Sequence, residues 1–390
     1  MEEVKIKVLF LIHDLEHGGA EKVLVNLVNN MDRTKFDISV TVLFGGGVNE
    51  QFLASDIHYR AVFPKKIPGN SKIMKLFTPK QLHRLCVKER YDIEVSYLEG
   101  PSARIVSGCQ HADTKLVSWI HIEQHTKKRA AGSFRSYRES VDCYRRFDRT
   151  ICVSQTVKED FLAIYPMLER VEVLYNTNET DQILALKDES VETNVFSEGE
   201  IRLCGVGKLL PIKGFDRLSR IHKRLRDEGY PVHSYVLGIG PERKKIEAYL
   251  AEHHLENTFT LLGYQTNPYK YVAKCDLFVC TSFSEGFSTA ATEALIVGTP
   301  VCTVEVSGMR EMLGENNEWG IVTENNEEAL YGGIKELLGN PNRLAHYRRM
   351  AEIRGKDFET KNTVQAVEKM LKGLIKSDSE RTNNKNAGKI

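Results

Sequence analysis

Two glutamates beside a glycine-containing turn are the residues of this sequence best suited to bind a ligand. Glu285 and Glu293 are separated by seven residues in the segment Ser-Glu-Gly-Phe-Ser-Thr-Ala-Ala-Thr-Glu. On one continuous helix, residues eight positions apart are rotated by about 80° about the helix axis, so the two carboxylates would point in different directions. They converge only if Glu285 belongs to a loop over 281–287 and Glu293 lies inside a helix capped by Ser288 or Thr289.

Such a loop and helix could bind a nucleoside-diphosphate sugar. The helix N-terminus presents free N–H groups and a dipole that favours a phosphate. Carboxylates beside an anion are costly unless they accept hydrogen bonds. This ligand supplies ribose hydroxyls for one glutamate and sugar hydroxyls for the other. Taken alone, these residues fit a solvated helix with incidental acids equally well.

Two lysines follow the strand expected over 201–206. Lys208 and Lys213 flank the segment Leu-Leu-Pro-Ile, with Gly207 before the first lysine and Gly214 after the second. Fixed cations at the end of a strand can neutralise a diphosphate and stabilise it as a leaving group. Surface lysines are common, so this pattern by itself is weak evidence.

A pair of glycines, Gly18 and Gly19, lies between the first expected strand and the first expected helix. Glycines there let a ligand approach the backbone, although a tight turn explains them equally well. A dinucleotide-binding fold needs Gly-x-Gly-x-x-Gly and an acidic residue at the end of the second strand. The sequence instead reads His-Gly-Gly-Ala-Glu and Val-Leu-Phe-Gly at these places. A nicotinamide-dependent oxidoreductase is therefore a poor fit.

The composition is that of a two-domain globular protein, with 390 residues of which 41% are apolar and 27% charged. The net charge of +1 gives no overall field for nucleic acid. The N-terminus does not show the basic region, long apolar run and small-residue cleavage site of a signal peptide. The sequence also contains no run of about 18 apolar residues that could span a membrane, so we expect a cytoplasmic chain. The eight cysteines form no Cys-x-x-Cys pair. Buried free thiols are the simplest interpretation, and a structural metal site is not expected.

Short apolar runs alternate with amphipathic stretches in two series, which predicts an α/β protein with two doubly wound halves and parallel sheets. The first series predicts strands over 4–12, 37–44, 93–97, 116–120, 150–153 and 171–175. The second predicts strands over 201–206, 232–237, 259–262, 277–280 and 300–303, after a polar connector over 181–200. Ligands of such sheets bind outside the carboxyl ends of the strands, so two halves facing each other would enclose a ligand.

Six motifs resemble, in chain order, those of glycosyltransferase family 4, a large family of retaining enzymes with the two-domain GT-B fold. They cover nearly the whole chain. The Glu-x₇-Glu segment followed by Gly-x-Pro-Val resembles the signature of that family. The other five are Gly18-Gly19-Ala20-Glu21, His121, Val153-Ser154, Tyr175-Asn176, and Gly207-Lys208-Leu209 with Lys213-Gly214.

The resemblance implies a role for each candidate residue. Lys208 and Lys213 would hold the diphosphate and stabilise the departing nucleotide. Glu293 would accept hydrogen bonds from the ribose, Glu285 from the transferred sugar, and His121 would face that sugar. Further donor contacts would come from Gly18, Gly19, Gly207, Gly263, Tyr264, Gly286, Phe287, Ser288 and Thr289.

In this family the leaving phosphate is thought to assist deprotonation of the acceptor on the same face of the sugar. The resemblance therefore implies retention without a protein nucleophile, a cofactor or a divalent metal, and the sequence lacks an Asp-x-Asp motif. Lys208 departs from the family pattern, because it stands where arginine is usual and lacks the bidentate geometry of arginine.

The same resemblance sets the expected domains. An acceptor-binding Rossmann-like domain is expected over 1–185 and a nucleotide-sugar-binding one over 186–358. A helix over 359–376 would pack back on the first domain, and the polar tail 377–390 is expected to be disordered.

Two basic stretches with apolar neighbours, 63–90 and 127–149, lie in the N-terminal half. They fit peripheral docking on the anionic inner face of the cell membrane as well as they fit a solvated charged face. N-terminal domains of the family bind the acceptor, which suits a lipid-linked or glycan acceptor. Nucleic acid is not expected as a partner, because no nucleic-acid-binding motif accompanies the basic residues.

Together these features predict transfer of a hexose or N-acetylhexosamine from a nucleotide-sugar to a lipid-linked or polysaccharide acceptor, as in capsular polysaccharide synthesis. UDP is the expected nucleotide because it is the most frequent one in the family. A non-catalytic sugar- or lipid-binding adaptor of the same fold stays open as an alternative, since intact motifs show a capacity to bind and not turnover.

Overall fold

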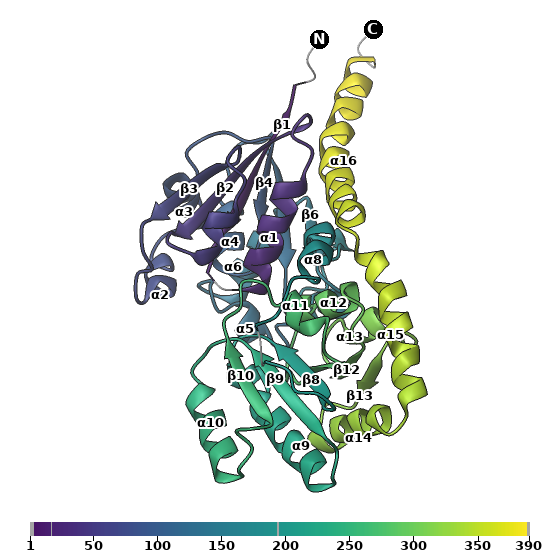
Figure 1. Ribbon diagram of the computed structural model, residues 1–390. Helices are drawn as coiled ribbons and strands as arrows, with labels where there is room; N and C mark the ends of the chain where they lie inside the picture. The colour runs from purple at the N-terminus through teal and green to yellow at the C-terminus, as the bar shows by residue number, and fades with distance from the viewer. Residues whose placement is uncertain (1–3, 17, 193–194, 388–390) are drawn as a thin grey trace. The chain divides into compact units, whose positions relative to one another are not determined.

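The computed structural model describes residues 4–16, 18–192 and 195–387, with the backbone alone over 376–387. It divides into two compact units, one formed by Met1–Thr177 with Thr360–Ile390 and the other by Asn178–Glu359. Each unit is built on one parallel sheet with helices packed against it (Figure 1). The expected α/β fold with two doubly wound halves is therefore confirmed.

The first unit contains a seven-stranded sheet in the order β3-β2-β1-β4-β5-β6-β7. Its strands are β1 (Ile6–Ile12), β2 (Phe36–Phe44), β3 (His58–Phe63), β4 (Ile93–Ser96), β5 (Lys115–Ile120), β6 (Arg149–Cys152) and β7 (Val171–Val173). The central strands are apolar almost throughout because helices cover both faces of a parallel sheet. Strand β3 has no fully buried residue and lies at the edge, so its sequence carries little strand signal.

The helices of this unit are α1 (Gly19–Asn30), α2 (Asn70–Met74), α3 (Pro79–Cys86), α4 (Pro101–Val106), α5 (Lys127–Ala130), α6 (Tyr137–Tyr144), α7 (Gln155–Ile164) and α16 (Thr360–Ala387), with a 3₁₀ turn over Val48–Phe52. Helix α16 lies beside α1 (Figure 1). Its Glu368 accepts a hydrogen bond of 2.7 Å from the backbone N–H of Asp32. The α16 backbone stays helical through Ala387, over most of the tail in which we expected disorder, and residues 388–390 lie outside the described part.

The second unit contains a six-stranded sheet in the order β10-β9-β8-β11-β12-β13. Its strands are β8 (Ile201–Val206), β9 (Val232–Leu237), β10 (Phe259–Gly263), β11 (Leu277–Cys280), β12 (Val301–Val304) and β13 (Ile321–Thr323). Its helices are α8 (Thr180–Leu186), α9 (Phe215–Asp227), α10 (Arg243–Glu252), α11 (Tyr269–Val272), α12 (Thr289–Ile296), α13 (Met309–Leu313), α14 (Glu327–Leu338) and α15 (Pro341–Gly355), with 3₁₀ turns over Pro211–Lys213 and Lys356–Phe358. Leu203 of β8, Val279 of β11 and Leu218 of α9 belong to one core cluster.

The expectation of an irregular connector over 181–200 is wrong in its first part, because α8 occupies that segment. Helix α8 packs against α11 and α12. Ile183 is its buried apolar anchor, and Asn267 donates a hydrogen bond of 2.9 Å to the carbonyl of Leu186. A short helix held by one apolar side chain gives almost no periodicity in sequence. The predicted domain boundary after residue 185 falls inside it.

All eight cysteines are buried free thiols, as the apolar runs around several of them predicted. Within the residues that the structure describes, no helix is both long and apolar enough to cross a bilayer. The cores of both units therefore rest on apolar packing, with the thiols acting as small apolar side chains.

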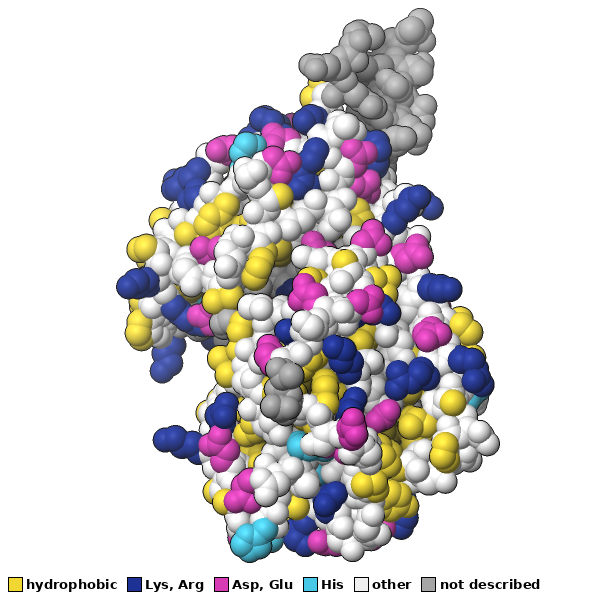
Figure 2. All heavy atoms as spheres, viewed as in Figure 1, with side chains coloured by type: hydrophobic (Ala, Val, Ile, Leu, Met, Phe, Trp, Pro, Cys, Tyr) yellow, Lys and Arg dark blue, Asp and Glu magenta, His cyan; other side chains and the backbone are white. Residues whose placement is uncertain are grey.

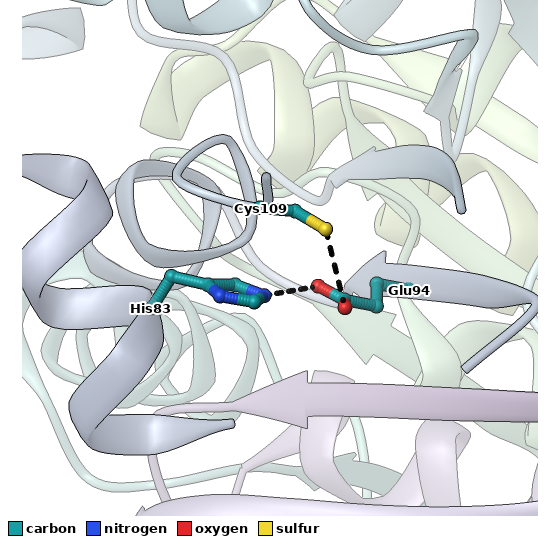
Figure 3. A group of neighbouring side chains, drawn as sticks. All are labelled: His83, Glu94 and Cys109. Carbon is teal, nitrogen blue, oxygen red and sulfur yellow. Dashed lines mark hydrogen bonds and ion pairs between the residues drawn. The ribbon is translucent and has the colours of Figure 1, made fainter. Parts of the chain in front are cut away.

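A buried polar group joins α3, β4 and the turn that follows α4 in the first unit (Figure 3). His83 of α3 lies with Nε2 at 2.8 Å from one carboxylate oxygen of Glu94 in β4. The Cys109 thiol donates to the other oxygen at 3.5 Å, so both oxygens of this fully buried carboxylate are partnered. Burial alone would lower the pKa of His83, but Cys109 and the Glu94 carboxylate outweigh it and raise that pKa to about 9. The pair is thus a buried ion pair at neutral pH.

This ion pair predicts a pH-dependent stability. A histidine with a raised pKa stabilises the fold fully below its unfolded pKa of about 6.5 and loses that contribution as pH rises through about 9. We expect His83→Gln to lower the free energy of unfolding, with the difference from wild type shrinking by about 2–3 kcal/mol between pH 6 and pH 10. Urea unfolding at several pH values measures this difference.

The control is His111→Gln, because His111 is exposed. That variant is expected to differ from wild type by the same small amount at every pH. A His83→Gln difference that does not change with pH would contradict the ion pair.

Candidate functional site

Two loops of the second unit meet at one edge of its sheet. Strand β11 pairs directly with β8, with Leu277 opposite Leu203. Because both strands run in the same direction, the segments that follow them, 207–214 and 281–288, leave the sheet side by side. These are the two segments in which the sequence predicted ligand-binding residues.

Backbone contacts join the two loops. The N–H of Phe283 donates to the carbonyl of Ile212 at 2.8 Å, and the Thr281 hydroxyl donates to the carbonyl of Lys213 at 2.7 Å. Gly214 has φ +65°, and a Cβ at that position would lie 2.2 Å from the Thr281 carbonyl oxygen. Only glycine fits both the left-handed backbone and this close approach.

Lys213 and Glu285, 72 residues apart in the sequence, form an ion pair across these loops. The Lys213 Nζ lies 2.6 Å from Glu285 Oε1, and the Ser282 hydroxyl donates to the same oxygen at 2.6 Å. A small pocket is lined by Lys213, Ser282, Glu285 and Ser288, together with residues of β8, β11 and the start of α9. With Thr281, which also lines it, one cation, one carboxylate and three hydroxyl-bearing residues surround this pocket.

Helix α12 begins at this pocket. Ser288 is its N-cap and accepts a hydrogen bond of 3.4 Å from the N–H of Ala291, which confirms the predicted cap. Thr289 is the first helical residue, while Gly286 and Phe287 precede the cap. Glu293 lies inside α12 and is nearly buried, and it is not among the residues lining the pocket.

The remaining predicted residues of the second unit lie at neighbouring strand ends. Lys208 is exposed, in contrast to the partly buried Lys213. Gly207 follows β8, and its carbonyl oxygen would be 1.8 Å from a Cβ at Gly238, so these two backbones pack directly together. Gly263 ends β10 with φ +73°, and the Tyr264 side chain after it is 46% exposed.

His121 lies at the end of β5 in the first unit, with its backbone N–H donating to Glu99 at 3.0 Å. Burial lowers the pKa of its imidazole to about 3, although a hydrogen bond to the Tyr97 backbone opposes this shift. The ring is therefore neutral at physiological pH. Its Nε2 is buried and has no hydrogen-bond partner among the described residues, which is unusual for a buried polar atom.

Gly18 and Gly19 lie where α1 begins, as predicted from the sequence. Gly18 is the N-cap residue in an extended conformation, and a Cβ there would overlap the Glu21 side chain. Because the overlapping atoms are the end of a flexible side chain and the backbone is extended, the structure itself does not require glycine at this position.

Two groups of side chains within the described ranges combine metal-ligand types, and both lie in the first unit. The first is the hydrogen-bonded group of His83, Glu94 and Cys109. The second consists of Glu123, His125 and Asp160. Asp160 there accepts hydrogen bonds from the N–H groups of Gln124 and His125, at 2.6 and 3.0 Å. Neither group contains a predicted site residue.

Three residues at the joined loops were not predicted from the sequence: Arg217, Thr281 and Ser282. Each acts through a contact with a residue far away in the chain. Arg217, for example, bonds the carbonyl of Thr281 across 64 residues. A single sequence holds no signal for such a pairing.

Comparisons with known proteins identify the family and the fold of this chain. The model of the Glycosyltransferase Family 4 matches residues 17–182, and that of the Glycosyl transferases group 1 matches residues 187–354. A transferase of Campylobacter jejuni is 26% identical over 94% of this chain and 100% of its own length. It is named N-acetylgalactosamine-N,N'-diacetylbacillosaminyl-diphospho-undecaprenol 4-alpha-N-acetylgalactosaminyltransferase.

Solved structures show the same fold. Anabaena Alr3699/HepE in complex with UDP and glucose superposes with a TM-score of 0.74 at 18% identity, covering 94% of this chain and 100% of that one. A glycosyltransferase from Rickettsia africae gives a TM-score of 0.74 at 16% identity, covering 95% and 99%. The two units thus have the fold of GT-B glycosyltransferases. The chain belongs to glycosyltransferase family 4 and is a glycosyltransferase.

The close approach of Gly214 to the Thr281 carbonyl predicts that a side chain at position 214 destabilises the fold. We expect Gly214→Ala to lower the free energy of unfolding by about 3 kcal/mol or more, because it adds backbone strain and an overlap with Thr281. Gly229→Ala is the control, since Gly229 also has a positive φ of +87° but nothing within 4 Å of its added Cβ. Denaturant unfolding of both variants checks this, and equal losses would contradict the close approach.

Proposed function

We propose that this glycosyltransferase transfers a hexose or N-acetylhexosamine from a UDP-sugar, with retention at the sugar, to a lipid-linked or glycan acceptor. The observation that carries the proposal is the pocket in which Lys213, Ser282 and Glu285 meet beside the N-terminus of α12. It offers positive charge for a diphosphate and a carboxylate for sugar hydroxyls. The Campylobacter relative is named for a diphospho-undecaprenol acceptor, and HepE was solved with UDP.

Donor binding would rearrange the ion pair. In the structure, Lys213 is held by Glu285. A diphosphate competes for the same ammonium group with more negative charge, so Lys213 would turn to the phosphates and leave Glu285 to accept hydrogen bonds from the sugar. Lys208, which is exposed, would supply a second cation.

Transfer would then proceed on one face of the sugar. The bond between the anomeric carbon and the diphosphate oxygen breaks, and the bond from that carbon to the acceptor oxygen forms. The acceptor proton passes to the leaving diphosphate. Lys208, Lys213 and the N–H groups at the start of α12 stabilise the charge that develops there, so we propose that neither a metal nor a cofactor is required.

His121 would contact the donor sugar as a neutral hydrogen-bond acceptor. Its Nε2 is buried without a partner in the described structure, and its low pKa keeps the ring uncharged. Glu293 would accept from the ribose. The backbone of Gly18, Gly19, Gly207, Gly286, Phe287, Ser288 and Thr289, with Gly263 and Tyr264 near the base, would complete the donor site.

An exposed apolar patch in the first unit supports the proposal of a lipid-linked acceptor. It is formed by Ile67, Ile73, Leu76 and Phe77. All four side chains are more than a third exposed, with Leu76 at 76%. Lysines surround them, and Figure 2 shows basic and hydrophobic side chains side by side over α2. We propose that this patch docks on the anionic inner face of the cell membrane, where a lipid-linked acceptor would be found.

The patch is held in a fixed shape. The carbonyls of Met74 and Phe77 accept hydrogen bonds of 2.7 Å from the buried Arg104. Those of Lys75 and Leu76 accept from Arg135 at 2.6 and 2.9 Å. Arg135 of the second basic stretch, 127–149, is thus engaged within the fold, and the first stretch would supply the surface for docking.

Ligand-dependent stability and product formation test the function. We expect UDP and one UDP-sugar to raise the melting temperature without added metal, and GDP, ADP and NAD⁺ to have no effect. A ligand at 100 times its Kd adds about 2.7 kcal/mol. The stabilising UDP-sugar is then assayed for transfer to a lipid-diphosphate sugar. Stabilisation by UDP-sugar without any product would favour a non-catalytic binding protein.

The Lys213–Glu285 pair predicts an asymmetric effect of Glu285→Gln. Removal of the carboxylate frees Lys213, so the affinity for UDP alone should rise by about threefold to tenfold. Transfer should fall by about 100-fold or more, because the sugar loses its charged acceptor. Calorimetry and product assays measure the two effects. The control is Glu336→Gln, which breaks an ion pair with Arg343 and should change neither the affinity for UDP nor the rate of transfer. A weaker affinity for UDP in Glu285→Gln would contradict the idea that Glu285 and the diphosphate compete for Lys213.

Membrane docking predicts that Leu76→Glu weakens binding to vesicles of phosphatidylglycerol and phosphatidylcholine. The loss of one buried leucine should reduce the partition coefficient by about tenfold. The control is Ile353→Glu, since Ile353 is 49% exposed in α15 of the other unit. Cosedimentation measures binding, and equal partitioning of both variants and wild type would exclude this patch.

A further inference from the structure

Arg217 is a buried cation behind the candidate site. It lies in the first turn of α9, three residues after Gly214, and is 2% exposed. Burial lowers the pKa of its guanidinium, yet the group stays charged at any physiological pH. No carboxylate within the described ranges lies at ion-pair distance from it. Burying an unpaired charge costs free energy of folding, and an apolar side chain would fill the same space without that cost. Arg217 therefore has a role other than packing.

Its hydrogen bonds go to the loops that follow the strands of the second sheet. One terminal nitrogen donates to the carbonyl of Thr281 and, at 3.3 Å, to that of Ser282. The other donates to the side-chain oxygen of Asn325 at 3.0 Å, in the segment after β13. The guanidinium also stacks on the Phe283 ring, with its central carbon 4.3 Å from the ring centre. One planar group therefore fixes three consecutive residues of the 281–288 loop.

The contacts continue from Arg217 to the carboxylate of the site. Ser282 accepts from Arg217 through its backbone carbonyl and donates through its hydroxyl to Glu285 Oε1 at 2.6 Å. Lys213 binds the same carboxylate oxygen, also at 2.6 Å. Arg217 itself does not line the pocket. Its influence on a ligand therefore passes through the loop residues that it bonds. These are Ser282, whose hydroxyl donates to Glu285, and Thr281, which lines the pocket.

We propose that Arg217 is a positioning residue that sets the orientation of Glu285 toward the sugar of the donor. The inference rests on the proposed UDP-sugar function and adds a residue and a role to it. A guanidinium can bond two carbonyls and an amide oxygen at once, whereas an ammonium group cannot reproduce this fork. Arg217→Lys keeps the charge and most of the bulk but releases the loop.

This role predicts a selective loss. The nucleotide diphosphate is held by Lys208, Lys213 and backbone N–H groups, none of which bonds Arg217. In Arg217→Lys we therefore expect the affinity for UDP to stay within about threefold of wild type. The preference for UDP-sugar over UDP should fall by about tenfold, the value of a hydrogen bond to a charged group. A residue that merely supported the loop would weaken both affinities together.

The test is calorimetry of the full chain with UDP and with the UDP-sugar that stabilises it best. Arg220→Lys is the matched control, one turn further along α9, because Arg220 pairs with Asp216 and Glu327 at the surface. It should leave both affinities unchanged. An unaltered preference in a folded Arg217→Lys variant overturns the proposal, and so does an equal loss of both affinities.

A second variant covers the case in which Arg217→Lys does not fold. Asn325 is exposed, and Asn325→Ala removes one acceptor of Arg217 while the arginine stays in place. We expect it to lower the preference for UDP-sugar by about threefold. No change in that preference would overturn the positioning role. If wild type binds no UDP-sugar at all, the proposed function itself fails, a result that is distinct from every variant effect.

Discussion

The carbonyl group of Thr281 is the point on which the candidate site of the second unit depends. Gly214 leaves room for it, and Arg217 donates to it from behind. Because one backbone atom is contacted from both sides, the loops after β8 and β11 cannot separate without losing both contacts. The ion pair between Lys213 and Glu285 depends on this junction, because the two residues belong to different loops and the junction holds those loops together. The positions of the charged side chains in the site are thus determined by the tight packing of the backbone beneath them.

The two units offer different chemistry at the ends of their strands. The first presents a neutral imidazole, His121, whose loop is held by the carboxylates of Glu99 and Asp160 through backbone N–H groups. The second presents a cation and a carboxylate, Lys213 and Glu285, that form an ion pair.

Much of the fold and part of the site could be predicted from the sequence. Strands β9 and β11 have the predicted bounds, because fully buried parallel strands are written as short, uninterrupted apolar runs. The glycines and charges at strand ends were located by their place after such runs. Helix α8 was missed because it has a single apolar anchor, Ile183. Arg217 was missed because its partners are distant in the chain, and a buried arginine reads like a surface one in a sequence.

The burial of every cysteine has a practical consequence for the study of this enzyme. A thiol that is shielded from solvent reacts slowly with maleimides, so a single cysteine introduced on the surface can be labelled without first removing the native ones. One fluorophore on each unit would then report the distance between them in solution. The burial of these thiols thereby makes the natural chain a convenient subject for fluorescence measurements of the distance between its two units.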